Sequence, residues 1–333
     1  MSSADDGRFE FNVGVTVMSP KSGRTAVTKW ALSLAVALSL SIAGCSKSEK
    51  PSYRLFASPE MAGAALLDAG KAGNENALLD IFGPDSKKVI SSGDPVQDRN
   101  AVNTFVAGYG QMHRWRTMPD GTKILLIGAD NFPFPIPLKK NAKGQWFFDA
   151  AAGKDEILRR RIGRNELAVI DVCEALAQAQ AEYFSEGHDG GRTRQYAMKL
   201  ISDPGKQNGL YWVSPAGQPR SPLGPLAAFA TADGYSVKQG SRAPFHGYYF
   251  RVLKGQGSHA SGGAKDYVVD GKMTGGFAFI AYPAEYGNSG VMTFMINRDG
   301  LLVQKDLGNA TARTAAAIQQ YDPDDSWIPV SGE

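Results

Sequence analysis

The stretch YPAEYGNSGVMTFMINRDG, residues 282–300, decides how the second half of the chain folds. It carries an apolar segment, residues 277–282, through a glycine-rich loop into a second apolar segment, residues 291–297. Arg298-Asp299-Gly300 then leads to residues 301–305, and an Asp-Gly pair tolerates the positive φ angles of a tight hairpin turn. The pattern predicts three successive antiparallel strands joined by a glycine loop and a hairpin.

The same stretch contains no arrangement typical of a catalytic centre. Gly287-Asn288-Ser289-Gly290 is one residue short of the G-x-S-x-G nucleophile elbow. It also lies between two strands, whereas such an elbow leads from a strand into a helix. We therefore predict that residues 282–300 specify turns of the fold.

The sequence before this stretch predicts one long helix and more strands. Apolar residues recur at helical spacing through residues 167–184, and GHDGG, residues 187–191, ends that pattern. Residues 248–253 (YYFRVL) predict a strand, and residues 266–270 a short one. A loop rich in proline and glycine spans residues 202–225. A helical turn at residues 196–201 and a short helix around residues 226–231 flank this loop.

The sequence of the first part of the chain predicts helices followed by a hairpin. Ser58 is a suitable N-cap and Pro59 a suitable first residue for a helix that ends before Gly73-Asn74. Two further helices are predicted around residues 76–82, which Gly83-Pro84 ends, and residues 102–109. Residues 123–128 predict a strand. Residues 134–139 and 145–149, on either side of residues 141–144, predict a hairpin.

Length and composition favour a two-domain α+β protein. With 333 residues, we expect domains at residues 56–160 and 161–330. Hydrophobic residues make up 43% of the chain and the net charge is +3, with both signs mixed along the sequence. A nucleic-acid-binding protein would cluster its basic residues, so no nucleic-acid partner is expected. The basic residues 159–161 and Arg164 lie beside acidic ones, which is typical of a solvated helix face or a domain junction.

The N-terminus has the organisation of a secretory signal peptide. We expect Met18 to be the true start, because acidic residues precede it. Lys21, Arg24 and Lys29 form a basic region, and residues 30–42 form an apolar run that is too short for a permanent membrane span.

The end of this segment, Ile42-Ala43-Gly44-Cys45, resembles the lipobox of bacterial lipoproteins. The resemblance implies cleavage between Gly44 and Cys45, fatty acylation of Cys45, and a lipidated tether over residues 45–55. Position 46 is Ser and not Asp, and by the same resemblance this implies the periplasmic face of the outer membrane. The alternative is an ordinary signal peptide with an incidental cysteine.

The second cysteine, Cys173, lies within the long predicted helix. Val169, Val172, Leu176 and Tyr183 share its helical pattern. No histidine is near in sequence, so we predict a buried packing residue and no reactive thiol.

No metal or catalytic motif is present, and no cofactor is expected. The four histidines, His113, His188, His246 and His259, are scattered without the spacing of paired metal ligands. Glu186, His188 and Asp189 only faintly resemble a calcium loop, and a helix end explains them better. The carboxylate pairs Asp266/Asp270 and Glu285/Asp299 have no separation fixed by the sequence.

One group of residues is a candidate binding patch. Tyr211 and Trp212 lie in the Pro/Gly-rich loop, and a second segment contributes His246, Tyr248, Tyr249 and Arg251. Aromatic residues and arginine are enriched in recognition surfaces, and sugar-like or peptide ligands suit them. The alternative is that these aromatics only pack the core and the loops.

Two partial resemblances concern the fold. The helices, hairpin and GQWFFD strand of the first part resemble the cystatin-like, nuclear-transport-factor-like fold. There, Trp115, Phe132, Phe134, Trp146 and Phe147 would either line a ligand-holding cone or form its core. Residues 165–184, HGYYFRV at 246–252 and residues 275–307 resemble the globular part of type IV pilins and pseudopilins. KDEILRRRIGRNE, residues 154–166, departs from the apolar helix that pilins need for filament assembly.

The chain as a whole resembles the bacterial secreted-protein family called domain of unknown function 2950. The resemblance rests on segments that include FASPEMAGAALLDA (56–69), SSGDPVQDR (91–99), IGRNELAVI (162–170), GLYW (209–212), SPLGPL (221–226) and HGYYFR (246–251). It covers about 280 residues and implies no assigned activity. We expect a non-catalytic, lipid-anchored envelope protein that binds another envelope component. The alternatives are an envelope hydrolase acting on wall or polysaccharide material, and a small-ligand carrier.

Overall fold

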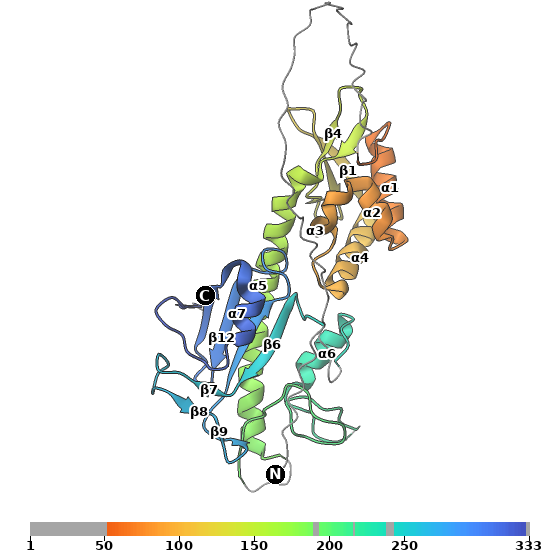
Figure 1. The fold of residues 1–333 in the computed structure, drawn as a ribbon. Coiled ribbons are helices and arrows are strands. Elements are labelled where there is room, and N and C mark those ends of the chain that lie inside the picture. The colour runs from red at the N-terminus through yellow and green to blue at the C-terminus, as the bar shows by residue number, and fades with distance from the viewer. Residues whose placement is uncertain (1–51, 189–192, 216, 238–242, 331–333) are drawn as a thin grey trace, which may run out of the picture. The chain divides into compact units, whose positions relative to one another are not determined.

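The computed structural model describes residues 52–188, 193–215, 217–237 and 243–330. All of them belong to one compact unit, residues 50–333. The predicted start at Met18, the cleavage site at Gly44 and Cys45, and the tether up to residue 51 lie outside the described residues. The described part is α+β, with one long helix and antiparallel sheets (Figure 1).

The three helices predicted for the first part are confirmed. Helix α1 (Pro59–Lys71) is capped by the Ser58 hydroxyl, which accepts a hydrogen bond from the amide of Met61 at 3.2 Å. Helix α2 (Glu75–Phe82) ends at Gly83, and α4 (Pro95–Gln111) begins after Asp94. The short helices η1 (Pro84–Ser86) and α3 (Lys87–Ile90) between them were not predicted.

These helices pack on a sheet with the strand order β1-β2-β4-β5, in which β3 also pairs with β2. The strands are β1 (His113–Thr117), β2 (Lys123–Ile127), β3 (Phe132–Pro133), β4 (Leu138–Lys140) and β5 (Trp146–Phe148). The predicted hairpin is present, with Leu138 opposite Phe148. Strand β1 was missed because four of its five residues are exposed and give no apolar alternation.

Helix α5 (Ala150–Glu186) is 37 residues long and begins 17 residues before the helix predicted at residue 167. Its N-cap is Asp149, whose carboxylate accepts a hydrogen bond from the amide of Ala152. The expected boundary between residues 160 and 161 falls inside this helix. Its buried residues Val169, Val172, Cys173 and Leu176 belong to the core of the second sheet.

The second sheet is antiparallel with the strand order β14-β13-β12-β11-β6. Its strands are β6 (Tyr248–Leu253), β11 (Ala278–Pro283), β12 (Met292–Asn297), β13 (Leu302–Asp306) and β14 (Ile328–Pro329). The predicted hairpin after residue 297 is confirmed, and Gly300 there has a φ of 77°. Residues 282–300 thus carry parts of β11 and β12 and the loop between them, as the sequence indicated.

Side chains alternate across this sheet, so its two faces meet different helices. Tyr248 points toward α5, where its hydroxyl approaches Glu166. Arg251, three residues further along β6, points the other way and donates to carbonyls of α7 (Thr311–Ala317) and Ile318. Figure 1 shows α5 behind the sheet and α7 in front of it.

The remaining elements are short. Helix α6 (Gly224–Ala232) confirms the helix expected around residues 226–231. The elements β7 (Gly255–Gln256), β8 (Lys265–Asp266), β9 (Val268–Val269), β10 (Lys272–Met273) and η2 (Gly308–Ala310) are two or three residues each. The helical turn predicted at residues 196–201 is wrong. Tyr196 and Ile201 instead form isolated bridges to Met273 and Tyr211, because strand-like backbone pairing replaces local hydrogen bonds there.

Aromatic rings pack against one another inside the first part of the unit. Phe148 is only 1% exposed, and its ring lies 5.5 Å from that of Phe82 and 6.1 Å from that of Phe134. Trp115 approaches the same ring at 6.4 Å, and Trp146 is buried. These rings belong to, or pack against, one buried hydrophobic cluster. Phe132, by contrast, is exposed, and Phe147 is half-buried.

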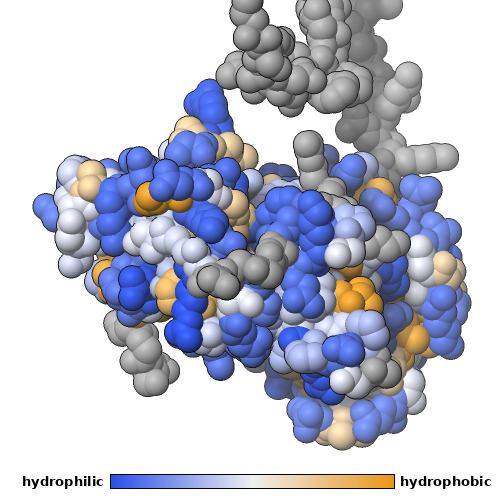
Figure 2. All heavy atoms as spheres, turned by 90° about the horizontal axis from the view of Figure 1, so that it is seen from below, coloured by the Kyte–Doolittle hydropathy of each residue, from blue (hydrophilic) through white to orange (hydrophobic). Residues whose placement is uncertain are grey.

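None of the helices in the described part of the chain combines the length and the hydrophobicity of a membrane span. Figure 2 shows one face of the molecule, on which hydrophilic residues predominate and apolar ones gather in small groups.

Cys173 is fully buried, as predicted, and burial raises the pKa of its thiol to about 12. The thiolate is the reactive form, so it is scarcely populated near neutral pH. We expect Cys173 in the folded chain to resist iodoacetamide at pH 8 and to react completely in concentrated urea. Peptide mass spectrometry identifies the modified residue. Rapid labelling of Cys173 under native conditions would contradict this packing.

Candidate functional site

Polar side chains from four distant segments meet beside the loop between β11 and β12. We call this group the polar cluster. It consists of Asp94, Arg161, Asn165, Glu166, Tyr235, Glu285 and Asn288. Asp94 and Asn165 are completely buried, and Asn288 and Arg161 nearly so. Buried polar groups of this kind need hydrogen-bond partners, and here the partners come from each other's segments.

Asp94 connects the start of α4 with the start of β6. One carboxylate oxygen accepts from the amides of Val96 and Gln97, which caps the helix. The other accepts from the Tyr235 hydroxyl at 2.8 Å and from the amide of Gly247 at 3.0 Å. Burial and the charge of Asp94 raise the pKa of Tyr235, so the phenol stays protonated as a donor.

Arg161 lies in the middle of α5 and holds both α3 and the glycine loop. Its guanidinium donates to the carbonyls of Lys88 and Val89, each at 2.9 Å, and to that of Ser91. It also donates to the side-chain oxygen of Asn288. Burial lowers its pKa, which still leaves an arginine protonated.

The next turn of α5 fixes the rest of the loop. Asn165 accepts from the Gln97 side chain at 2.7 Å and donates to the carbonyl of Ser289 at 2.8 Å. Glu166 accepts from the amides of Val291 and Met292, both at 2.9 Å. One turn of α5 thereby provides hydrogen-bond partners for backbone groups of a glycine-rich segment about 125 residues away in sequence.

Glycines allow the backbones to approach this closely. A Cβ at Gly290 would lie 2.0 Å from the Tyr248 hydroxyl, and one at Gly247 would lie 2.7 Å from the Asn165 amide nitrogen. Gly247 also has a φ of 74°, which favours glycine. Close packing therefore explains Gly247 of HGYY and Gly290 of YGNSG, whereas Gly287 has open space around it and a φ of 70°.

Asp94 has little free capacity for acid–base chemistry, because each of its two oxygens accepts two hydrogen bonds. Glu285 is exposed, and it accepts from the Asn288 amide at 2.8 Å within its own loop. The buried carboxylate of the cluster therefore joins segments of the fold.

His246 follows the polar cluster, but its ring packs against aromatic rings. The imidazole lies 4.3 Å from Phe245 and 5.8 Å from Tyr235, measured between ring centroids. Burial lowers its pKa, although the charges of Asp233 and Asp94 act in the opposite direction. His246 is therefore held as a neutral ring near neutral pH.

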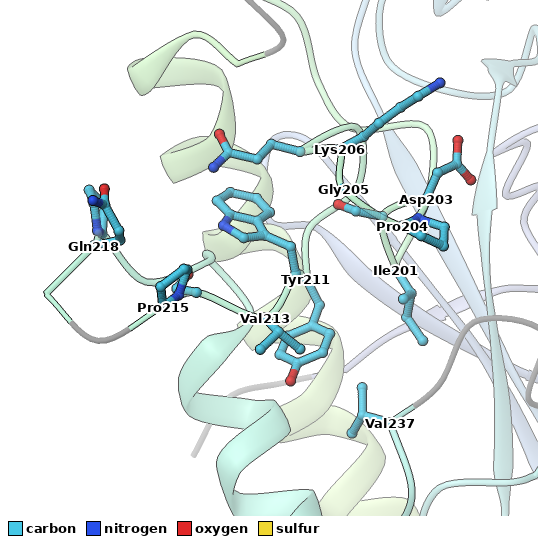
Figure 3. Close-up of a pocket in the computed structure, with 15 residues that line it drawn as sticks. Ile201, Asp203, Pro204, Gly205, Lys206, Tyr211, Val213, Pro215, Gln218 and Val237 are labelled. Carbon is cyan, nitrogen blue, oxygen red and sulfur yellow. The ribbon is translucent and has the colours of Figure 1, made fainter.

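Tyr211 and Trp212, from the predicted binding patch, line an open pocket of about 420 Å³ (Figure 3). We call it the Tyr211–Trp212 pocket. Its other lining residues are Ile201, Ser202, Asp203, Pro204, Gly205, Lys206, Gln207, Val213, Ser214, Pro215, Gln218, Pro219 and Val237. In Figure 3 the Tyr211 ring lies near Val213 and Val237, and Lys206 and Asp203 point outward.

The other members of the predicted patch lie elsewhere. Tyr248 is fully buried and donates to the carbonyl of Met292 at 2.9 Å. Tyr249 is half-buried and packs at 5.7 Å from the ring of Tyr282. Arg251 holds the end of α7, as described above. The six residues do not form one surface, since only Tyr211 and Trp212 share the pocket.

The weaker candidates from the sequence have ordinary surroundings. His188 packs on Tyr183 and Trp212, and Asp189 lies outside the described residues. Asp266 and Asp270 are exposed. Within the described ranges, no three His, Cys, Asp or Glu side chains gather closely enough to hold a metal ion. An exposed pair that the sequence did not suggest is His259 and Asp322, 2.9 Å apart.

A family model described as "Protein of unknown function (DUF2950)" matches residues 53–330. The chain belongs to the DUF2950 family. No curated protein matches the chain, and no solved structure matches it either.

Several motifs by which the sequence resembles the DUF2950 family meet in the polar cluster. SSGDPVQDR supplies Asp94, IGRNELAVI supplies Asn165 and Glu166, and HGYYFR supplies Gly247. Sequence reasoning missed these roles. The available signal was the pattern Asp94-Pro95, an N-cap followed by proline, which places a carboxylate at a helix start.

Proposed function

We propose that this DUF2950 protein is a lipid-anchored protein of the bacterial cell envelope that acts as a non-catalytic binding module. The structural observation that carries the proposal is the polar cluster. Asp94, Glu166 and Arg161 are engaged in hydrogen bonds that join distant segments, which supports a scaffold role for the family motifs. The pocket beside Tyr211 and Trp212 supports a role in binding.

The proposed setting rests on the sequence of the N-terminus. The run ending in Ile42-Ala43-Gly44-Cys45 supports export, cleavage before Cys45 and acylation of its sulfur. Several acyl chains together give stable anchoring where one is marginal. Ser46 supports the periplasmic face of the outer membrane. The partners proposed are the membrane, through the lipid, and an envelope protein or polysaccharide.

The proposal also includes the known folds that the two parts of the chain resemble. Helices α1, α2 and α4 on the sheet β1–β5 support a cystatin-like first domain. The second half of α5 packed on β11 and β12 supports a pilin-like second domain. The first half of α5 carries Arg159, Arg160 and Arg161, so the proposal includes no filament assembly.

The first experiment tests the anchor. Replacement of Cys45 by Ala is expected to move the protein from the membrane fraction to the soluble fraction of fractionated cells. The chain with Cys173→Ala is the control and should stay in the membrane fraction. Mass spectrometry of the mature N-terminus measures the added acyl mass directly. An uncleaved leader, or a free thiol at Cys45, would overturn the proposed setting.

The second experiment tests the binding role. The tethered protein is crosslinked in whole cells and captured, and the captured material is analysed for protein and for polysaccharide. Recovery of one envelope component in stoichiometric amount supports the module. Release of soluble fragments from purified wall material by the protein, without stable capture, would favour the rival hydrolase.

A further inference from the structure

The Tyr211–Trp212 pocket has the chemistry of a site for a neutral polyhydroxylated ligand. Two aromatic side chains and three prolines, Pro204, Pro215 and Pro219, provide apolar walls. The pocket's volume, about 420 Å³, lies within the range of small-molecule sites. Apolar walls with a few polar groups between them are typical of such sites.

One polar atom in this pocket lacks a partner. The hydroxyl of Ser214 is buried, and none of its possible hydrogen bonds is made within the described part of the chain. A buried hydroxyl without a partner destabilises a protein, so we expect a partner beyond the described residues, and a bound ligand can supply one. A hydroxyl both donates and accepts, which suits another hydroxyl group.

The charged residues at the pocket do not favour a charged ligand. Asp203 forms an ion pair with Lys199 at 2.7 Å and accepts from the Asn208 side chain at 2.7 Å. Lys206 points away from the pocket (Figure 3). Gln207 and Gln218 add neutral polar groups to the apolar walls.

The indole of Trp212 is held in position before any ligand binds. The centroid of the His188 ring lies 5.2 Å from that of the indole in an edge-to-face arrangement. The Tyr183 ring in turn packs on His188, with a centroid distance of 4.3 Å. Preorganisation of this kind reduces the entropy lost on binding.

We propose that the Tyr211–Trp212 pocket binds a sugar ring of an envelope glycan. The C–H groups of a pyranose carry partial positive charge and match the electron-rich face of an aromatic ring. The ring's hydroxyl groups match Ser214 and the glutamine amides. A polyproline-like peptide also suits tryptophan, tyrosine and proline walls, but it does not bring the donor-and-acceptor groups that Ser214 needs. The proposal rests on the proposed envelope location, which brings glycans within reach.

The test is a binding titration on the full chain in a detergent that contains no sugar. The probes are glucose, galactose, mannose, N-acetylglucosamine and their disaccharides, with a polyproline peptide as the competing class. Binding is read from the intrinsic fluorescence of tryptophan and from ligand-observed NMR. We expect saturable binding of at least one sugar probe and none of the peptide.

Two variants locate the site. Ser214→Ala removes a hydroxyl with no protein partner, so stability should be unchanged or slightly higher, and sugar affinity should fall about five- to tenfold. Trp212→Ala should weaken binding at least about tenfold. Phe132→Ala is the matched control, because it removes an exposed ring, 53% accessible, from the first part of the unit. Its affinity should equal that of the parent chain.

Three results would overturn the proposal: no saturable binding of any sugar probe, equal binding by all three variants, or binding of the peptide alone. These outcomes are separate from the anchor test. If the chain is lipidated but does not bind sugars, only the proposed ligand of the pocket is wrong. If the chain is not lipidated but binds sugars, only the proposed envelope location is wrong.

Discussion

Replacing Arg161 by Met is expected to lower the free energy of unfolding by about 3–5 kcal/mol. The guanidinium donates to the carbonyls of Lys88, Val89 and Ser91 and to the Asn288 side chain. Methionine keeps the apolar stem but removes the guanidinium donor, so the Asn288 oxygen and the Val89 carbonyl, which lie in buried residues, lose it. Each lost partner in a buried position costs the desolvation of a polar group, and Arg161 itself is only 8% exposed.

Urea-induced loss of far-ultraviolet circular dichroism measures this change. Arg159→Met on the same helix is the control, since its side chain is 70% exposed and pairs only with Glu156. Exposed pairs of that kind contribute little, so the control should unfold at the same urea concentration as the parent chain. Equal midpoints for both variants would show that Arg161 does not hold the segments together.

This prediction concerns a residue that the sequence placed on a solvated helix face or at a domain junction. Arg159, Arg160 and Arg161 are consecutive, and a run of basic residues normally faces water. In the structure Arg159 is exposed, whereas Arg161, only two residues on, is 8% exposed. A helix turns by 100° per residue, so adjacent charges face different environments. The sequence does not show which segments of the chain pack against each face of this helix.

Local patterns predicted the elements whose signals are local. Ser58-Pro59 marked the start of α1, and Arg298-Asp299-Gly300 marked the hairpin between β12 and β13. Caps and turns are determined by neighbouring residues, and apolar alternation gives the strands of a half-buried sheet. Boundaries were less accurate, because α5 continues through residues 150–166 without an apolar face that distinguishes it from a loop.

The sites were harder to predict because they are made by distant segments. Glu166 and Met292 are 126 positions apart, and Asp94 and Gly247 are 153 apart. No spacing within one helix or strand encodes such pairs. Tyr211 and Trp212 were found because aromatic residues in a Pro/Gly-rich loop stand out locally. Tyr248 and Arg251 have the same composition signal, but the structure uses them inside the sheet and at α7.

The polar cluster also explains why the glycine-rich loop needs α5. Residues 287–290 have few side chains with which to pack, and the amides of residues 287–289 bond to carbonyls within the loop. The contacts that fix the loop on the rest of the fold come from α5. Asn165 donates to the Ser289 carbonyl, Glu166 accepts from the next two amides, and Arg161 donates to the Asn288 side chain. We therefore expect α4, α5 and this loop to unfold together as one cooperative unit.

Replacing Asp94 by Ala is the second change with a large expected effect. It removes the cap of α4, and it leaves the Tyr235 hydroxyl and the Gly247 amide buried without an acceptor. Loss of the cap alone lowers the free energy of unfolding by about 1 kcal/mol, and each buried donor left without an acceptor lowers it by about 1–3 kcal/mol. We expect a total loss of about 3–5 kcal/mol in the free energy of unfolding, measured in urea.

Ser58→Ala separates the two contributions, because Ser58 caps α1 and no hydrogen bond from a distant segment to its side chain is seen in the described part of the chain. It should cost only about 1 kcal/mol. A double-mutant cycle with Asp94→Asn and Tyr235→Phe then measures the contact between the two segments, with an expected coupling of about 1–3 kcal/mol. If Asp94→Ala costs no more than Ser58→Ala, or if the cycle is additive, Asp94 is only a helix cap. The join between α4 and β6 would then have to come from apolar packing around Tyr235 and Phe245, whose rings lie 4.8 Å apart.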